Sequence, residues 1–305
     1  MKQLFLYLFS LVFIISSCTG NKKTDRTNDT TTDSISNEIV VTSQLKFNES
    51  TLPYDGGVLI ANFGGETLNP LNSDGNGYIA YYKNDSVEIF FPDDGSLNAP
   101  KGMLVKGDYL YVADVNRVVA LNLKDTSITP VSIQLPDNET FANDLTADGN
   151  TLYVSVTNTG NIYTIDVSNP TELPTQKPQL YTNILGANGL LLVDSKLYVA
   201  SYPADGLTTD KNLVYVINDL KNPVAEPLIE QPGQYDGLAL SSDKKTLYVT
   251  NWSPVQLEAV NLENQVISTV PMDTQLESMA DISIENDKIF IPDLVGSKLI
   301  IKSLK

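Results

Sequence analysis

Histidine is absent from this chain of 305 residues, and cysteine occurs once. Without histidine there is no Ser-His-Asp triad, no imidazole general base and no histidine-ligated metal site. A single cysteine excludes an internal disulfide and a cysteine-rich metal site. Any metal that the protein binds is therefore expected to be a hard cation with oxygen ligands, such as calcium.

Basic residues are also scarce. The chain has 20 Lys and Arg against 37 Asp and Glu, a formal net charge of -17 at pH 7, and its basic residues form no cluster. Nucleic acids and anionic membrane surfaces are bound through clustered Lys and Arg, which replace counterions. Nucleic acid is therefore not an expected partner, and the acidity is interpreted as an aid to solubility.

A hydrophobic run long enough for a membrane-spanning helix is missing at the N-terminus. Lys2 is followed by a shorter apolar run from Leu4 to Ile15, which predicts a signal peptide over residues 1–17. The run ends in Ile15-Ser16-Ser17-Cys18, which resembles the lipobox of bacterial lipoproteins, where the cysteine carries a diacylglycerol. The alternative is an ordinary signal peptide followed by a chance cysteine. Lipidation of Cys18 is favoured because no other cysteine exists.

Three segments are expected. They are a signal peptide at 1–17, a lipidated cysteine with a polar tether at 18–37, and one folded domain at 38–305. The tether is too polar to bury a core. The domain is expected at the bacterial cell envelope as a monomer, in the periplasm or on the outer-membrane surface, with the lipid as its membrane attachment.

Five stretches of the chain open with a polar residue and soon reach Leu-Tyr-Val or an equivalent. The openings are Lys101, Asn143, Asn188, Asp236 and Asp281, which differ by 42, 45, 48 and 45 positions. This period is typical of propeller blades built from four short strands. A ring of blades places the openings at one radius, so all five side chains are expected to face one central pocket.

The blade count follows from how the ring closes. The last repeat, 281–305, has room for three strands, and the alternating segment 37–47 can supply the missing outer strand. With 49–91 as the first blade, the chain predicts an all-β, six-bladed β-propeller closed by strands from both termini. The Gly- and Asn-rich loop 64–77 is expected to lie over one face.

The openings resemble those of a known family. Glu49 precedes the first inner strands, and three later openings read Phe141-Ala142-Asn143-Asp144, Ala187-Asn188-Gly189-Leu190 and Tyr235-Asp236-Gly237-Leu238. This pattern is similar to the senescence marker protein/gluconolactonase family and the related paraoxonases, six-bladed propellers with calcium in the central channel. The resemblance covers roughly residues 38–305. It implies that Glu49, Asn143, Asn188 and Asp236 bind calcium or another divalent metal with oxygen ligands.

The chemistry of these four residues agrees with a calcium site. Calcium takes six to eight oxygen ligands, here two carboxylates and two amide carbonyls, with water or substrate completing the shell. The alternative is that Asn and Asp before Gly only make turns into the inner strands.

The resemblance implies a calcium-dependent lactonase or ester hydrolase of the gluconolactonase type, acting on small lactones such as aldonolactones. The metal would polarise the carbonyl, with Asp236, or else Asp144, as the base. Lys101 and Asp281 are candidate substrate-binding residues. Lys101 could also offset negative charge or pair with Asp144, and the pairing is favoured. Asp281 could equally be a ligand, a base or a turn residue.

A binding function is the alternative. A non-catalytic propeller resembling NHL-repeat proteins would use its ring face to hold a glycan, a peptide or a protein at the envelope. Fold alone does not separate the two, because propellers host both. The Asn and Asp openings favour the enzyme. The missing histidines, which paraoxonases use as a pair, favour the binding protein.

Overall fold

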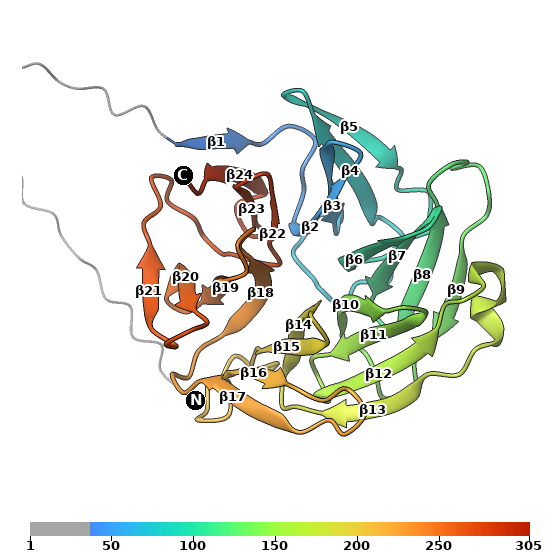
Figure 1. The fold of residues 1–305 in the computed structure, drawn as a ribbon. Helices are drawn as coiled ribbons and strands as arrows, with labels where there is room; N and C mark the ends of the chain where they lie inside the picture. The colour runs from blue at the N-terminus through green and yellow to red at the C-terminus, as the bar shows by residue number, and fades with distance from the viewer. Residues whose placement is uncertain (1–36) are drawn as a thin grey trace, which may run out of the picture. The chain divides into compact units, whose positions relative to one another are not determined.

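The computed structural model describes residues 37–305, which form six four-stranded antiparallel sheets arranged in a ring (Figure 1). This confirms the six-bladed β-propeller. The predicted signal peptide, Cys18 and almost all of the predicted tether lie outside the described residues. Within residues 37–305, no helix is long and apolar enough to span a membrane. The described helical segment is a short 3-10 helix, η1, at Pro170–Thr175.

The first three blades follow one another along the chain. Blade 1 comprises β2 (Asn48–Tyr54), β3 (Gly57–Asn62), β4 (Tyr78–Lys83) and β5 (Ser86–Phe91). Blade 2 comprises β6 (Pro100–Lys106), β7 (Tyr109–Asp114), β8 (Arg117–Asn122) and β9 (Val131–Gln134). Blade 3 comprises β10 (Ala142–Asp148), β11 (Thr151–Val156), β12 (Asn161–Asp166) and β13 (Gln179–Asn183).

The other three blades complete the ring. Blade 4 comprises β14 (Ala187–Val193), β15 (Lys196–Ser201), β16 (Val214–Ile217) and β17 (Ala225–Ile229). Blade 5 comprises β18 (Tyr235–Leu240), β19 (Thr246–Trp252), β20 (Val255–Asn261) and β21 (Ile267–Val270). Blade 6 comprises β22 (Ser283–Glu285), β23 (Lys288–Asp293), β24 (Lys298–Ser303) and, from the other end of the chain, β1 (Glu38–Val41).

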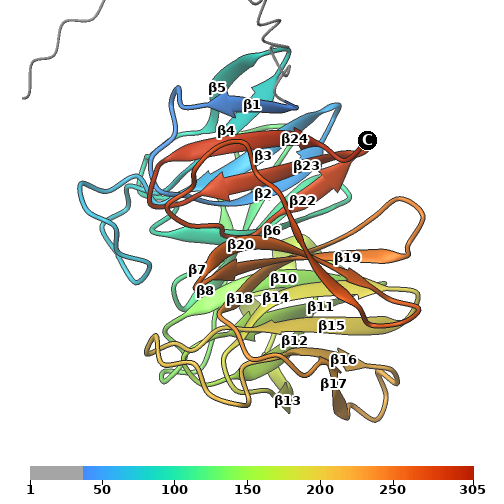
Figure 2. The same ribbon diagram turned by 90° about the vertical axis from the view of Figure 1, so that its left-hand side faces the viewer.

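Closure by both termini is confirmed. β1 pairs with β24 in antiparallel register from Glu38 opposite Lys302 to Val41 opposite Leu299, and Figure 2 shows the two strands side by side. The edge that β24 would otherwise expose is thereby covered.

The side chain of Glu38 anchors the closing strand. It accepts hydrogen bonds from the backbone N–H groups of Asp273 (2.9 Å) and Thr274 (2.8 Å), and it pairs with Lys302 Nζ at 3.1 Å. Burial by itself raises the pKa of Glu38, but these donors outweigh it and leave the pKa below its ordinary value of 4.5.

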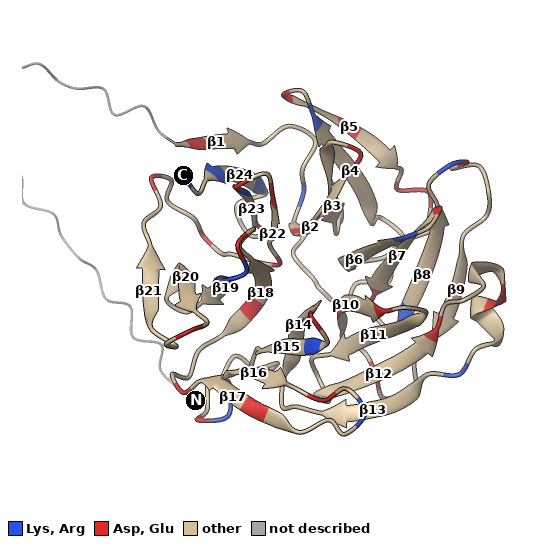
Figure 3. Cartoon of the chain, in the orientation of Figure 1, with Lys and Arg blue, Asp and Glu red and all other residues tan. Residues whose placement is uncertain are grey.

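The core lies between neighbouring sheets. On β7, Leu110 and Val112 pack toward blade 1, while Tyr111 between them packs toward blade 3. The second strand of a blade is thus buried on both faces, as its run of consecutive apolar residues predicts. Acidic residues are spread over the blades rather than gathered on one of them (Figure 3).

Glu38→Gln is expected to lower the free energy of unfolding by about 1–3 kcal/mol at neutral pH, because Lys302 loses its buried partner. The folded-state pKa of Glu38 is lowered, so the carboxylate's contribution is present above pH 4.5 and is lost as pH falls through that lower pKa. The difference between the two proteins should therefore shrink in acid. Urea unfolding at a series of pH values measures it.

Glu263→Gln is the matched control. Glu263 pairs with Lys245 at 3.1 Å, but the two side chains are 68% and 59% exposed, so its removal should cost under about 1 kcal/mol. Equal losses for the two variants would show that Glu38 contributes no more than a surface ion pair.

Candidate functional site

The opening residues stand at β-bulges of the inner strands. In blade 2, Pro100 pairs with Asp114 and Met103 with Val112, so that Lys101 and Gly102 together face one residue of β7. The same irregularity occurs in β2, β10, β14 and β18. A bulge bends the strand and re-aims a side chain, here into the central channel.

The first bulge position of five blades carries a polar side chain. All five side chains are buried and line one cavity of about 240 Å³, called here the channel pocket; they are Glu49, Lys101, Asn143, Asn188 and Asp236. The structure therefore brings together the four predicted metal ligands and Lys101. We call these five residues the floor of the pocket.

The second bulge position requires glycine in three blades. A Cβ on Gly189 would lie 2.1 Å from the carbonyl oxygen of Asp236, and one on Gly102 would lie 2.2 Å from Asp144 Oδ1. A Cβ on Gly237 would lie 2.5 Å from the backbone nitrogen of Ile282 and 2.6 Å from Asp281 Cα. These glycines lie within strands, so the interpretation of Asn-Gly and Asp-Gly as turns is wrong here. They let adjacent inner strands approach each other.

Asp281 does not line the channel pocket, contrary to the prediction. Its N–H donates to the Glu49 carbonyl at 2.9 Å, and it forms a parallel bridge with Ser50, a second-position residue. Ala280 takes the first position in blade 6. The spacing gave a partial signal, because Lys101, Asn143 and Asn188 precede their Leu-Tyr-Val runs by nine residues and Asp281 precedes Ile289 by eight, but Asp236 precedes Leu247 by eleven.

Hydroxyl groups confirm this register. Ser50 Oγ donates to the Lys101 carbonyl at 2.6 Å, and Ser155 Oγ donates to the Asn188 carbonyl at 2.5 Å. In the same way, Thr250 Oγ1 donates to the Ala280 carbonyl at 3.0 Å. Ala280 therefore corresponds to the other first-position residues.

Asp144 shares the second position and also faces away from the channel pocket. With Asp281 it lines a separate cavity of about 300 Å³ formed by later residues of the inner strands. Its carboxylate accepts N–H groups of Leu145 and Leu190, both at 2.6 Å, while burial raises its pKa to about 7. The candidate base Asp144 is therefore bound to the backbone of its own and a neighbouring inner strand, outside the channel pocket.

Lys101 does not pair with Asp144, which corrects the favoured expectation. Its ammonium donates to the carbonyls of Pro70 (2.7 Å) and Ala99 (2.9 Å) and lies over the Phe63 and Phe141 rings, at 5.1 and 5.3 Å from their centroids. Burial lowers the pKa of Lys101 to about 8, against the opposing charges of Glu49 and Asp114.

Four floor oxygens have no hydrogen-bond partner among the described residues although they are buried; they are Glu49 Oε2, Asn143 Oδ1, Asn188 Oδ1 and Asp236 Oδ1. Buried polar atoms are normally satisfied, and leaving one unpaired is costly. Two carboxylates and two amide carbonyls are ligands that calcium prefers. No group of three or more acidic, His or Cys side chains in the described chain could hold a metal, so such a site depends on the amides.

The two floor carboxyls are electrostatically disfavoured as anions. Burial raises the pKa of Asp236 to about 7 although Trp252 donates a hydrogen bond to it. Burial also raises the pKa of Glu49, and the charge of Asp236 adds to the effect. A divalent cation between them would restore the ionised forms.

Aromatic and aliphatic residues form the rest of the pocket, called here its walls: Phe63, Leu68, Pro70, Phe141, Tyr202, Ala204, Trp252 and Leu294. Trp252 Nε1 donates to Asp236 Oδ2 at 2.6 Å, and the Tyr202 ring meets the indole edge-on with centroids 5.8 Å apart. Leu68 and Pro70 belong to the loop 64–77, which therefore lies over the channel as predicted.

The wall residues were not among the residues predicted from the sequence. Four of them lie at or directly after the end of the second strand of a blade, five positions after the residue that opens its Leu-Tyr-Val run; they are Phe63, Tyr202, Trp252 and Leu294. The same repeat period that revealed the floor could have revealed them.

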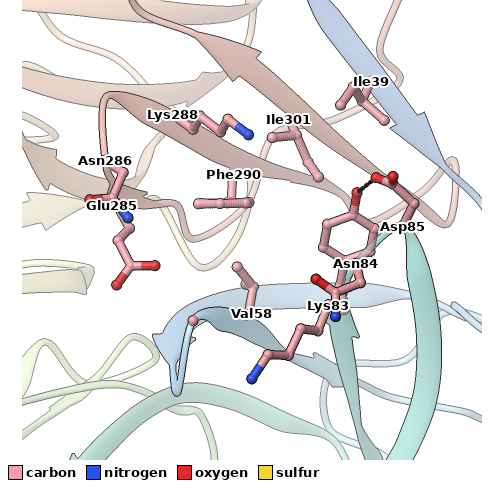
Figure 4. A pocket seen from close by; sticks show the side chains of 13 residues that line it. Ile39, Val58, Lys83, Asn84, Asp85, Glu285, Asn286, Lys288, Phe290 and Ile301 are labelled. Carbon is pink, nitrogen blue, oxygen red and sulfur yellow. Dashed lines mark hydrogen bonds between the residues drawn. The ribbon is translucent and has the colours of Figure 1, made fainter.

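A further hollow of about 290 Å³ lies between blades 1 and 6 (Figure 4). Val58, Phe290 and Ile301 form its apolar part, and Tyr82 donates to Asp85 at 2.9 Å. None of the orphaned buried oxygens of the described residues belongs to it. The channel pocket is therefore the candidate site.

Comparisons with known proteins support the fold more than the activity. The family model of the LVIVD repeat matches residues 101–120 and 141–176, in blades 2 and 3. No curated protein matches the chain in sequence.

Solved propellers match over most of the chain. A putative oxidoreductase (glucose dehydrogenase) from Thermus thermophilus matches with a TM-score of 0.62 at 14% identity. The match covers 87% of this chain and 99% of the oxidoreductase chain. Virginiamycin B lyase from Staphylococcus aureus, an inactive variant with quinupristin, has a TM-score of 0.58 at 14% identity, covering 88% and 98%.

A nidogen/laminin complex gives a TM-score of 0.60 at 11% identity, covering 84% of this chain and 88% of that chain. At such identities the likeness shows the fold alone. Enzymes and a protein known in complex with laminin share this architecture, so the function must be argued from the pocket.

Gly189→Ala is expected to destabilise the protein by about 1–3 kcal/mol or more, because the new methyl group meets the backbone of the next inner strand. Gly65→Ala is the control, since there the nearest atom is the Asn72 side-chain amide at 3.1 Å, which can move. Thermal unfolding of both variants measures the difference. Similar melting temperatures would contradict the close approach at the bulge.

Proposed function

We propose that this protein is a calcium-dependent hydrolase of small lactones or esters, anchored to the bacterial cell envelope through Cys18. The convergence of four orphaned oxygens on one pocket carries the proposal. The resemblance to gluconolactonases agrees with it. The pocket is complete within one chain, so a monomer suffices.

Glu49, Asn143, Asn188 and Asp236 would hold the cation. When bound, the cation supplies a Lewis acid that polarises the substrate carbonyl. Another divalent cation that prefers oxygen could take its place.

Asp236 is the residue placed to accept a proton from water. Trp252 fixes its Oδ2 at 2.6 Å, while Oδ1 accepts no protein hydrogen bond and has two lone pairs, one for the cation and one for the proton of water. Holding one oxygen fixes the orientation of the carboxylate, which a general base needs. Asp144 is a poorer base for this pocket, because both its oxygens accept backbone N–H groups outside it.

A non-catalytic binding protein is the second candidate. The mostly apolar walls favour it, since they could hold a ligand without reacting with it. The absence of histidine also removes the commonest acid–base residue. In that case the cation would be structural, and the ring face would bind a glycan, a peptide or a protein.

Added calcium is expected to raise the melting temperature, because a ligand that binds only the folded state stabilises it, by about 2.7 kcal/mol at a hundred times its Kd. Glu49→Gln and Asp236→Asn should each remove most of this stabilisation. Thermal unfolding with calcium and with chelator, together with elemental analysis, measures it. A melting curve indifferent to both, with no metal found, would contradict the site.

Asp236→Asn is expected to lower kcat/KM on lactones by about a hundredfold or more, because both the charge and the proton acceptor are lost. Asp281→Asn, which changes a buried channel carboxyl outside the pocket, should keep most of the rate. A panel of lactones and aryl esters with calcium, magnesium, manganese and zinc tests both variants. Metal binding without turnover above the Asp236→Asn level would favour the binding protein.

A further inference from the structure

The polar and apolar side chains of the channel pocket come from different parts of the fold. The floor comes from bulges in the inner strands, and the walls come from residues at the ends of the second strands and from loops. A ligand therefore meets oxygen and nitrogen atoms at its buried end and mostly carbon around the rest.

Many polar atoms of the floor are already committed. The Lys101 ammonium is bound by the Pro70 and Ala99 carbonyls, and Asp236 Oδ2 is bound by Trp252. The four orphaned oxygens form the cation site of the proposed function. The amide N–H groups of Asn143 and Asn188 stay available to the buried end of a ligand, whereas the walls offer a polar ligand group only the Tyr202 hydroxyl among their side chains. Several ligand hydroxyls that lay against the walls would be buried without enough partners, which is unfavourable.

We infer that the channel pocket selects lactones or esters that carry an apolar substituent and disfavours polyhydroxylated sugar lactones. This inference rests on the proposed function, since it names the substrate class of the same pocket. It departs from the aldonolactones that the resemblance to gluconolactonases implies. The reactive carbonyl would meet the floor, and the substituent would lie against the walls.

Leu68, a wall residue on the loop 64–77, extends the apolar surface of the pocket. Leu68 is 39% exposed, so a substituent that covers it removes apolar area from water. Its loop is tied to the floor, because Pro70 accepts the Lys101 hydrogen bond at 2.7 Å. The hydrogen bond between Lys101 and Pro70 thus holds the loop that carries Leu68 over the pocket.

Trp252, the one tryptophan of the chain, reports occupancy of the pocket without turnover. The full chain with calcium is titrated with δ-valerolactone, the same ring carrying a butyl group, and δ-gluconolactone, and the fluorescence of Trp252 is followed. The butyl lactone is expected to bind more tightly than the unsubstituted ring, by up to about fourfold per methylene. δ-Gluconolactone is expected to bind more weakly than either.

Leu68→Asn should weaken binding of the butyl lactone by about three- to tenfold and weaken binding of the unsubstituted ring by clearly less. The matched control is Leu207→Asn, since Leu207 is 69% exposed on another loop and does not line the pocket. It should behave as the wild type.

The outcomes separate this inference from the proposed function. Tight binding of the butyl lactone without hydrolysis supports the apolar selectivity and contradicts the proposed hydrolase activity. Preference for δ-gluconolactone with hydrolysis overturns the selectivity and keeps the hydrolase. Equal binding of all three lactones, or no response of Trp252 to any of them, overturns the selectivity whether or not hydrolysis occurs.

Discussion

The close approach of the inner strands around the channel is the constraint on which the rest of this structure depends. Bulges in five inner strands turn one side chain into the channel and place the next residue against the neighbouring blade. Glycine at 102, 189 and 237 makes this possible. The same geometry that packs the blades therefore gathers the floor of the channel pocket.

Bringing the floor residues together has an electrostatic cost, because the carboxyl groups of Glu49 and Asp236 are taken out of water. Lys101 offsets their charge only in part, since its ammonium is bound by carbonyl groups instead of pairing directly with a carboxylate. The raised pKa values of Glu49 and Asp236 express this imbalance. A bound divalent cation would reverse it, and its binding would stabilise the fold and prepare the site together.

The propeller assigns different tasks to its parts. Inner strands supply the polar floor, whereas residues at the ends of the second strands and the long loops supply the walls. Loops tolerate substitution more readily than inner strands. The identity of Leu68 and its neighbours can thus change the ligand while the floor stays the same, so proteins of this architecture can differ in function.

The sequence by itself determined the blade repeat, closure by both termini and the four residues that carry the orphaned oxygens, because each depends on a local pattern that recurs in register. From the sequence, Asp281 was predicted at the bulge position that Ala280 occupies, and Lys101 was predicted to pair with Asp144. The walls also went unnoticed, although their period was present. Only the tertiary structure decided these points, since a bulge shifts register and a buried ammonium binds whichever acceptor, here Pro70 on a distant loop, folding brings within reach.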